Sequence, residues 1–308
     1  MALDEEAVEK LVKAGEIAAR TRELGARLVR EGSRASEVCS RLEEYIVENG
    51  ARPAFPCNFS VNHVAAHYTP GVSDDVVVKE GDIVKVDVGV SIDGFIADTA
   101  VTVDVGGSHE GLVRASEEAL DAVVRLMRPR IRIYEIGKAI EPVVKRRGFR
   151  VIRNLAGHTI GRYTIHAGTS IPNYPERKSF YARIEPGTVV AIEPFATNGR
   201  GYVVEGGPVN IYAYTGKKPR IPLNELETEI LEHVREEYRT LPFTPRWLAR
   251  RWRPEEVVEA LKSLASKGVL HAYPVLVESG RGLVSQAEHT FVVLKDRVIA
   301  TTCPECGQ

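Results

Sequence analysis

The stretch of sequence that decides the fold is Gly81-Asp-Ile-Val-Lys-Val-Asp-Val-Gly-Val-Ser-Ile-Asp-Gly-Phe-Ile-Ala-Asp-Thr-Ala-Val-Thr-Val103. Valines alternate with other residues in its first half, which is the period of a β-strand, and the Asp-Gly pair that follows is typical of a tight hairpin turn. The pattern therefore predicts two antiparallel strands. Whether the two-residue loop ends at Asp93 or at Gly94, pairing places Asp98 on the same face as Asp87, directly opposite it or one diagonal away.

Two carboxylates held this close repel each other, which makes Asp87 and Asp98 candidates for a metal site. The repulsion is costly unless a cation or a shared proton neutralises it. An exposed strand face that carries two unrelated charges is the alternative, and the hairpin alone does not decide between the two.

A second stretch repeats the pattern of the first. Gly187-Thr-Val-Val-Ala-Ile-Glu193 places Glu193 at the same offset from its leading glycine as Asp87 has from Gly81. Upstream, two segments of helical periodicity carry identical residues in register, namely Glu37, Glu43, Gly50 and Arg52 in the first and Glu135, Glu141, Gly148 and Arg150 in the second. The match indicates an internal duplication. Two αβ halves related by a pseudo-two-fold axis would bring the acids of both halves around one central site.

Composition limits the class of protein. The chain has 308 residues, of which 44% are hydrophobic, and a formal net charge of -1. A chain of this length can bury the core of one large domain or two smaller ones, and its charge does not favour binding to nucleic acid. No apolar run is long enough to span a bilayer, and the N-terminus begins an acidic amphipathic helix rather than a signal peptide. We therefore expect a cytoplasmic protein.

The four cysteines do not have the pattern of a disulfide framework. Cys39 and Cys57 lie far along the chain from Cys303 and Cys306. The tail sequence Cys303-Pro-Glu-Cys306 is one half of a zinc motif, and a frayed terminus or a chance pair of thiols is its simplest interpretation.

Periodicity predicts the order of the secondary-structure elements. Helices are expected near 4–31, 35–49, 109–127 and 134–147, and strands around 180–205, 272–277 and 283–294. Between these strands, the pattern from about 217 to 269 is helical and charged, which indicates an insertion. We expect an α+β protein with one domain formed by 1–210 and 272–308 and a helical, winged-helix-like insertion formed by 211–271. Glu288 lies at the centre of the last strand segment.

Three histidines are candidates to complete the site. His158 and His166 lie in a run punctuated by glycines, which allow a backbone to approach a ligand closely, and His67 precedes the first strand of the hairpin. A single histidine in such a place is more often a structural hydrogen-bonding residue than a ligand. Four acids centred in strands make the functional interpretation the better one for this set.

Five short motifs, taken together, resemble the metal-ligand motifs of the methionine aminopeptidases, and they occur in the order of that family. They are Val84-Lys-Val-Asp-Val-Gly, Ala97-Asp-Thr-Ala, Gly157-His-Thr-Ile-Gly, Ala191-Ile-Glu-Pro-Phe and Gln286-Ala-Glu-His-Thr. The stretch Ala54-Phe-Pro-Cys-Asn-Phe-Ser-Val-Asn-His-Val-Ala-Ala-His-Tyr-Thr-Pro and the helical insertion resemble the type II enzymes. The chain lacks the charged N-terminal extension of the eukaryotic type II enzymes, so it is similar to the compact archaeal ones. The tail cysteines depart from the family pattern.

The resemblance implies a pita-bread fold, with two αβ halves around a cleft that holds two divalent metal ions. Asp87 would bind one metal, Asp98 and Glu288 would bridge both, and His158 and Glu193 would bind the second. Four carboxylates and one imidazole suit cobalt, manganese, iron or zinc without choosing among them. A water shared by the two ions would attack the scissile carbonyl, and Glu193 would also take its proton.

The resemblance also implies a catalytic and binding role for residues outside the metal ligands. His166 would stabilise the tetrahedral oxyanion, and His67 would contact the peptide near the scissile bond. Ordinary core packing is the alternative for the residues that would line the methionine pocket, which are Phe55, Ile165, Phe195 and Tyr273. The expected substrate is the N-terminal methionine of nascent proteins, with a small second residue. We expect a monomer that binds neither nucleic acid nor membrane, with the ribosome as a candidate docking partner.

Three other interpretations remain open. Prolidases and proline-specific aminopeptidases share the five-ligand site, but they usually carry a sizeable domain before the first aspartate, whereas only 86 residues precede Asp87. Non-enzymatic relatives have lost ligands, and all five are present here. A DNA-binding insertion would need an exposed basic face, and the acidic residues around the candidate arginines disfavour one. These arginines are Arg246, Arg250, Arg251 and Arg253.

Overall fold

The computed structural model describes residues 3–73 and 75–306. Its helices are α1 (Glu5–Leu28), α2 (Ala35–Glu48), α3 (Glu110–Val124), α4 (Ile133–Arg146), α5 (Glu225–Glu237), α6 (Pro245–Leu248) and α7 (Pro254–Ser266), with short 3-10 turns η1 (Arg177–Ser179) and η2 (Pro304–Cys306). The first strands are β1 (Arg52–Pro53), β2 (Asn58–Val61), β3 (Val64–Ala66), β4 (Ile83–Ile92), β5 (Phe95–Asp104), β6 (Arg150–Val151), β7 (Ala156–Ile160) and β8 (Ser170–Pro172). The later strands are β9 (Thr188–Ile192), β10 (Phe195–Thr197), β11 (Val203–Glu205), β12 (Ile211–Tyr214), β13 (Leu270–Tyr273), β14 (Leu276–Glu278), β15 (Val284–Gln286), β16 (His289–Val293) and β17 (Val298–Ala300).

The predicted hairpin is formed by β4 and β5. Its loop is Asp93-Gly94, whose φ angles of 51° and 85° lie in the left-handed region that a two-residue hairpin turn requires. Gly89 pairs with Asp98 and Asp87 pairs with Ala100. Asp98 therefore lies one diagonal away from Asp87 on the same face, which confirms the prediction.

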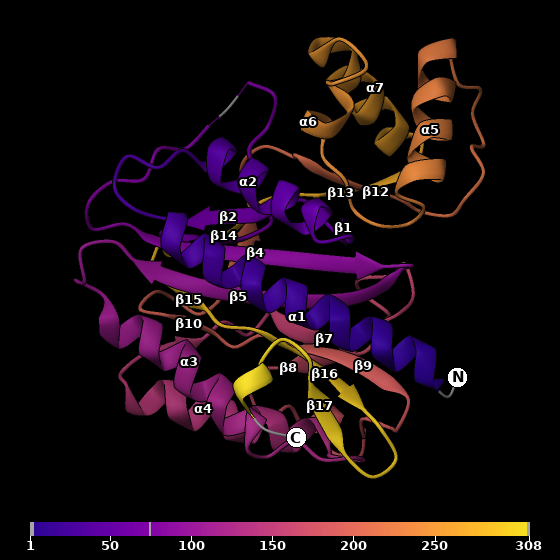
Figure 1. Cartoon of the computed structure of the whole chain (residues 1–308). Coiled ribbons are helices and arrows are strands. Elements are labelled where there is room, and N and C mark those ends of the chain that lie inside the picture. The colour runs from indigo at the N-terminus through magenta and orange to yellow at the C-terminus, as the bar shows by residue number, and fades with distance from the viewer. Residues whose placement is uncertain (1–2, 74, 307–308) are drawn as a thin grey trace.

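Helices cover the sheets of both halves, as the repeated pattern predicts (Figure 1). Helix α1 packs on the β4–β5 hairpin, and α3 and α4 pack on each other and on strands of the second half. The second half contains a five-stranded sheet in the order β17-β16-β9-β7-β8. The segment 180–187, which was predicted to be part of a strand region, contains no named strand, and β9 begins only after Gly187, whose φ is 87°.

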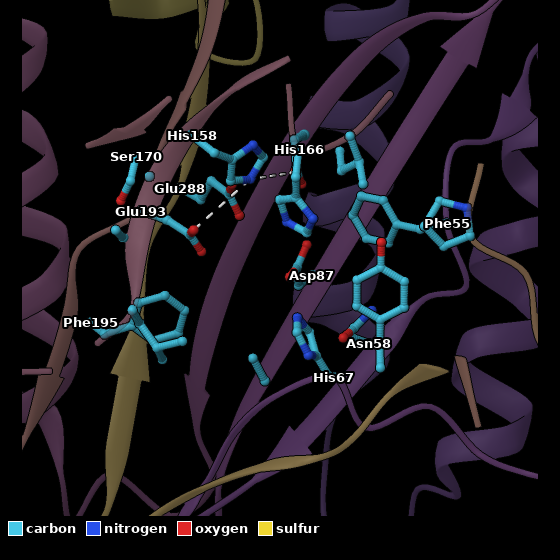
Figure 2. A pocket seen from close by; sticks show the side chains of 18 of the residues that line it. Phe55, Asn58, His67, Asp87, His158, His166, Ser170, Glu193, Phe195 and Glu288 are labelled. Atoms are coloured by element: carbon cyan, nitrogen blue, oxygen red, sulfur yellow. Dashed lines mark ion pairs between the residues drawn. The ribbon is translucent and has the colours of Figure 1, made fainter. Parts of the chain in front are cut away.

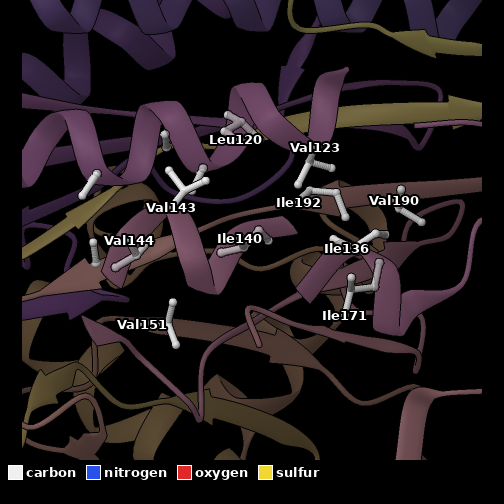
Figure 3. Packing of buried hydrophobic residues seen from close by; sticks show 14 of the residues in the cluster. Leu120, Val123, Ile136, Ile140, Val143, Val144, Val151, Ile171, Val190 and Ile192 are labelled. Carbon is white, nitrogen blue, oxygen red and sulfur yellow. The ribbon is translucent and has the colours of Figure 1, made fainter. Parts of the chain in front are cut away.

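A large apolar core holds the second half together and positions one acid of the site. Ile136, Ile140 and Val143 follow the helical spacing of α4 and face Val190 and Ile192 of β9 (Figure 3). Because β9 is anchored by these contacts, the residue that follows it, Glu193, leaves the sheet at a defined place.

Threonine side chains join the hairpin to the second half. Thr290 donates its hydroxyl to the carbonyl of Asp98 over 2.8 Å and accepts the Asp98 N–H over 2.7 Å. The Thr99 hydroxyl donates to the carbonyl of Glu288 over 2.7 Å. These bonds bring the backbone of two candidate metal ligands from distant parts of the chain side by side.

The segment between β12 and β13 forms a layer with its own apolar cluster. Helices α5, α6 and α7 pack around Phe243, Leu248 and Leu261, at the upper right of Figure 1. The layer is attached to α2 through Arg246, whose guanidinium bonds both carboxylate oxygens of the buried Glu43 at 2.8 and 2.9 Å. Arg246 is thus engaged in an internal ion pair rather than in an exposed basic face. No helix among the described residues has both the length and the apolar character needed to cross a membrane.

Candidate metal centre

The five predicted metal ligands line one cavity of about 380 Å³ (Figure 2). They come from five different strands or strand ends, because Asp87 is in β4, Asp98 in β5 and His158 in β7, while Glu193 follows β9 and Glu288 precedes β16. The pseudo-symmetric sheets therefore meet where the sequence pattern places the acids.

The polar atoms of the site are spaced for an ion between them rather than for direct hydrogen bonds. His158 Nε2 lies 3.7 Å from Asp98 Oδ2 and 4.0 Å from Glu193 Oε1. One ligand atom each from Asp98, His158 and Glu288 lies within 4.8 Å of the other two. Separations of this size between ligand atoms are those of groups that share one cation at about 2.0–2.2 Å each.

Several buried polar atoms of this cluster have no hydrogen-bond partner among the described residues. These atoms are Asp87 Oδ1, Asp98 Oδ1, His158 Nδ1 and Glu288 Oε1. A buried polar atom without a partner is costly, and a cluster of them needs an explanation such as an unseen ion. The donor set of carboxylate oxygens and imidazole suits divalent metal ions, so the residues present fit the metals that the sequence implies.

The pKa values of the acids point the same way. Burial raises the pKa of Asp87 to about 7. Burial, together with the neighbouring acids, raises the pKa of Asp98 and that of Glu288 well above the usual range, and burial with the charge of Asp87 does the same for Glu193. These carboxylates cannot all be ionised at neutral pH without a compensating positive charge.

Two further histidines stand at the same cavity in neutral form. Burial, then the neighbouring His166, lowers the pKa of His67 to about 4, and burial also lowers the pKa of His166. The ring of His166 lies edge-on to that of His158, with centroids 4.5 Å apart. The ring centroid of Tyr273 lies 5.6 Å from that of His67 and 6.1 Å from that of His166.

The four predicted pocket residues also line this cavity. Phe55, Ile165 and Phe195 are buried, and Tyr273 is partly exposed. Gly89 in β4 makes room for one of them, because a Cβ atom there would lie 2.2 Å from a ring carbon of Phe55. A larger residue at Gly89 would therefore push Phe55 into the cavity.

Sequence reasoning missed several residues that the structure places at the site, and four of them bear on its chemistry. Ile211 and Pro242, which come from the inserted segment and its edge, line the cavity. Gln286 reaches two acids, with its Nε2 3.4 Å from Glu193 and 3.3 Å from Glu288, and it opens the last of the five motifs.

Asn58 is the fourth of the missed residues. It lines the cavity and pairs with Asp87 across β2 and β4. Its Nδ2 donates to the carbonyl of Pro56 over 2.8 Å, which fixes the orientation of the amide. Its Oδ1 is buried and has no partner among the described residues. The feature of the sequence that could have identified Asn58 is its position between Phe55 and His67, in the stretch that resembles the type II enzymes.

Comparison with known proteins gives the class that this fold and site define. Residues 9–217 match the model of metallopeptidase family M24. A methionine aminopeptidase of Pyrococcus abyssi is 46% identical over 296 residues, which cover 96% of this chain and 99% of that protein.

Solved structures support the same fold. A thermophilic Arx1 superimposes with a TM-score of 0.85 at 17% identity, covering 97% of this chain and 91% of the other. The methionine aminopeptidase of Thermotoga maritima gives a TM-score of 0.69 at 24% identity, covering 97% of each chain. At these identities the two structures speak for the fold alone, which is the mixed helix and sheet architecture predicted from the sequence.

The chain belongs to metallopeptidase family M24, and within it to the methionine aminopeptidases, which are hydrolases. The prediction of the family from the five motifs is therefore confirmed.

Proposed function

We propose that this enzyme uses two divalent metal ions to remove the N-terminal methionine of nascent proteins, with a preference for a small second residue. One observation carries the proposal: buried carboxylates from both halves of the fold converge with His158 on one cavity and leave polar atoms unpartnered. Such a site is complete only when cations occupy it.

In this proposal the metal ions would be held by Asp87, Asp98, His158, Glu193 and Glu288, with Asp98 and Glu288 placed to serve both ions. When bound, the ions would be cobalt, manganese, iron or zinc, and they would polarise the scissile carbonyl and activate a water as nucleophile. Gln286 positions two of the ligands, because its amide N–H groups lie within reach of Glu193 and Glu288.

Three side chains would act on the substrate directly. Glu193 takes the proton of the attacking water and passes it toward the leaving amine. His166, which burial keeps neutral, donates a hydrogen bond to the oxyanion that forms at the scissile carbonyl. His67 contacts the peptide next to the scissile bond. Its Nδ1 lies 3.3 Å from the carbonyl of Pro274, which leaves its other nitrogen free to meet the substrate.

The substrate's free α-amine needs an acceptor at the closed end of the site. The metal-ligand acids are one group of acceptors, and Asn58 Oδ1 is another, because it is buried at the cavity and has no partner among the described residues. An ammonium group that donates to Asn58 would satisfy this oxygen and orient the first peptide bond toward His166. This contact would distinguish a free N-terminus from an internal peptide.

The methionine side chain would lie between Phe55, Ile165, Phe195 and Tyr273. Aromatic edges suit a polarizable sulfur, and aliphatic walls suit an unbranched chain. The inserted segment contributes Ile211 and Pro242 to the same wall, which supports treating 211–271 as an insertion that shapes the pocket of a domain formed by 1–210 and 272–308. Nascent chains are the proposed partner, and we place the enzyme in the cytoplasm as a monomer that binds neither nucleic acid nor membrane.

The experiment that tests the proposal measures methionine release from peptides beginning Met-Ala, Met-Val and Met-Leu and from x-Pro peptides. Enzyme stripped of metal and enzyme reconstituted with two equivalents of each candidate ion are compared. We expect metal-dependent release that is fastest for Met-Ala. Cleavage of x-Pro peptides alone would mean that the enzyme is a prolidase. Full activity with one equivalent of metal would refute the proposal that two metal ions are needed.

A further inference from the structure

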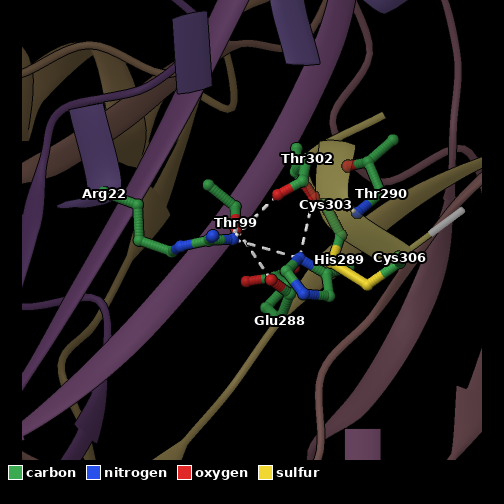
Figure 4. Close-up of a disulfide and its surroundings, with 8 residues drawn as sticks. All are labelled: Arg22, Thr99, Glu288, His289, Thr290, Thr302, Cys303 and Cys306. Atoms are coloured by element: carbon green, nitrogen blue, oxygen red, sulfur yellow. Dashed lines mark hydrogen bonds between the residues drawn. A yellow bond between two sulfur atoms is a disulfide. The ribbon is translucent and has the colours of Figure 1, made fainter. Parts of the chain in front are cut away.

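The C-terminal tail is docked against the metal-site half rather than frayed. Cys303 and Cys306 are joined by a disulfide across the turn η2, with Cα atoms 5.4 Å apart (Figure 4). Cys303 is 5% exposed, and Cys306 is partly exposed. The expectation of a frayed terminus is therefore wrong for the described tail residues, which are ordered as far as Cys306.

The residues just before the disulfide are hydrogen-bonded to the strand that follows Glu288. Thr301 donates its N–H to the carbonyl of Thr290 over 2.9 Å, and Thr302 Oγ1 accepts the N–H of Thr290 over 3.0 Å. Thr290 is the residue whose hydroxyl bonds the backbone of Asp98. One residue, Thr290, thus connects the tail to a proposed bridging ligand.

Arg22 of α1 makes a second connection. Its Nη1 donates to the carbonyl of Thr302 over 3.0 Å and to Thr99 Oγ1 over 2.7 Å, and Thr99 in turn bonds the carbonyl of Glu288. The described part of the chain offers Arg22 no carboxylate at ion-pair distance. Its positive charge lies beside the residue that precedes Cys303, and Glu305, which lies between the two cysteines, acts on it through its own charge.

His289 decides what chemistry the two sulfur atoms can do. One ring nitrogen of His289 and both sulfurs lie within 4.8 Å of one another, which is close enough for a metal ion. Arg22, however, lies 3.1 Å from Nδ1 of His289 and can only donate. The neutral ring then carries its proton on Nε2, so ligation through Nε2 would turn a second donor toward Arg22. The surroundings therefore suit a thiol pair beside positive charge better than a metal ion.

We propose that Cys303 and Cys306 form a thiol–disulfide exchange site whose oxidised form holds the tail against the metal-ligand strand. The oxidant is a low-molecular-weight disulfide. One thiolate attacks it, forming a mixed disulfide and releasing one small thiol; the second thiolate then displaces the other small thiol and closes the ring. Two cysteine thiols lose two electrons and two protons in all, and the small disulfide gains both and becomes two thiols.

The exposure of the two sulfurs sets the order of the steps. Cys306 is the more exposed residue and meets the small disulfide first, while the buried Cys303 resolves the mixed disulfide. Disulfides in the cytosol of mesophiles are rare and are mostly transient or redox-sensing, whereas hyperthermophilic archaea keep permanent ones, so reversibility under glutathione is what separates an exchange site from a permanent bridge in a chain that we place in the cytoplasm. The cytoplasmic location is the part of this argument that rests on the proposed function.

Reduction of the Cys303–Cys306 disulfide would loosen the turn η2. Because Thr302 is bonded to Thr290, reduction would also loosen β16, the strand that directly follows Glu288. Chain ends that lose their anchor become mobile. Outer-shell partners of a metal ligand typically contribute about 10–100-fold to metal affinity. We therefore expect the reduced enzyme to bind metal about tenfold more weakly than the oxidised one, near the lower end of that range.

The test equilibrates the full chain with mixtures of reduced and oxidised glutathione and maps the state of each cysteine by alkylation and peptide mass spectrometry. We expect Cys303 and Cys306 to convert reversibly between thiols and a disulfide. Mapping is needed because Cys39 and Cys57 also lie close together, with sulfurs 2.9 Å apart, although both are buried. Oxidation of that pair alone, or a tail that never oxidises, would overturn the proposal.

Two single variants form the matched control. Cys303→Ser should accumulate a glutathione adduct on Cys306, because the resolving thiol is missing, whereas Cys306→Ser should stay unmodified at the buried Cys303. Equal labelling of both variants would contradict the assigned order. Neither outcome depends on peptidase activity, so this test can fail or succeed whatever becomes of the proposed function.

Metal affinity is then measured after the glutathione has been removed by desalting. We expect the roughly tenfold difference between oxidised and reduced enzyme to disappear in the Cys303→Ser/Cys306→Ser variant. Equal affinities for the two wild-type forms would overturn the coupling to the metal strand. An additional zinc ion per reduced chain that this double variant loses would replace the exchange site with a metal site.

Discussion

Glu278 and Glu288 are both buried, each 1% exposed, yet they differ in their hydrogen-bond partners and in the direction in which their pKa is shifted. The carboxylate of Glu278 accepts the backbone N–H groups of Arg200, Gly201, Gly280 and Gly282. Burial would raise the pKa of Glu278, but these four bonds outweigh it and the pKa is lowered. The pKa of Glu288 is raised by burial and by its acidic neighbours, and Glu288 Oε1 has no partner among the described residues.

The difference separates a structural acid from a functional one. A buried charge with all its hydrogen bonds supplied by the protein stabilises the native state and needs nothing more. A buried carboxylate with an oxygen left unpartnered beside other acids is retained only where something outside the chain completes it. Glu278 joins two loops to each other, whereas Glu288 is a proposed ligand of a cation.

The largest predicted effect follows from removing the charge of Glu288. Glu288→Gln keeps the shape of the side chain, and we expect it to abolish turnover and reduce the metal content per chain. In the metal-free protein the same variant should melt at an equal or higher temperature, because a repelling carboxylate has been removed from a cluster of acids. Metal analysis, peptidase assays and thermal unfolding with and without metal check this. A variant that retains metal and activity would break the comparison.

The next effect concerns the two histidines that lie edge-on to each other. His158→Ala should weaken metal binding, because it removes a ligand. His166→Ala should leave metal binding unchanged and lower kcat by roughly a hundredfold or more, which is the scale of losing one oxyanion donor. Titration of metal into each variant, followed by kinetics at saturating metal, separates the two. Similar metal loss in both would mean that their roles are wrongly assigned.

Glu278→Gln tests the structural side. An amide cannot serve four N–H groups as a carboxylate does, so we expect a loss of about 2–3 kcal/mol in the free energy of unfolding. Because the pKa of Glu278 is lowered in the folded state, its contribution is present above the unfolded pKa and is lost as the pH falls through the folded value. The difference between wild type and variant should therefore shrink in acid. Denaturant unfolding at a series of pH values checks this, and a difference that grows in acid would refute it.

The smallest predicted effect comes from substituting Asn58, a neutral residue that can be compared with Glu288. Asn58 has a buried oxygen without a partner among the described residues, as Glu288 does, but it carries no charge. Asn58→Ala should lower kcat/KM for Met-Ala peptides about tenfold, which corresponds to one hydrogen bond to an ammonium group. Asn58→Asp, which keeps the acceptor, should retain more activity. Binding of methionine and of its analogue without the amine is the deciding measurement: the alanine variant should lose affinity only for methionine.

Much of the fold could be predicted because its signals are local. The alternation of residues 81–103 defines the hairpin and the shared face of Asp87 and Asp98, since side chains of a strand point to opposite faces in turn. Helical periodicity placed α1 to α4 within a few residues of their observed ends. The five motifs were sufficient for the family, because each motif is a short run of adjacent residues.

Other features depend on contacts between distant parts of the chain, and no local pattern contains them. Glu278 looks like any strand glutamate until the loops at 199–201 and 280–282 fold around it. Asn58 Oδ1 is left without a partner among the described residues once the Nδ2 of Asn58 donates to Pro56 and β2 pairs with β4. The tail cysteines are held at a fixed place because the preceding residue, Thr302, is hydrogen-bonded to β16 and to Arg22. Periodicity and motifs along the sequence thus determined which elements form and which acids share a face, whereas tertiary packing decided which buried polar groups are fully satisfied, because partners such as Arg200 and Gly201 of Glu278 lie far away along the chain.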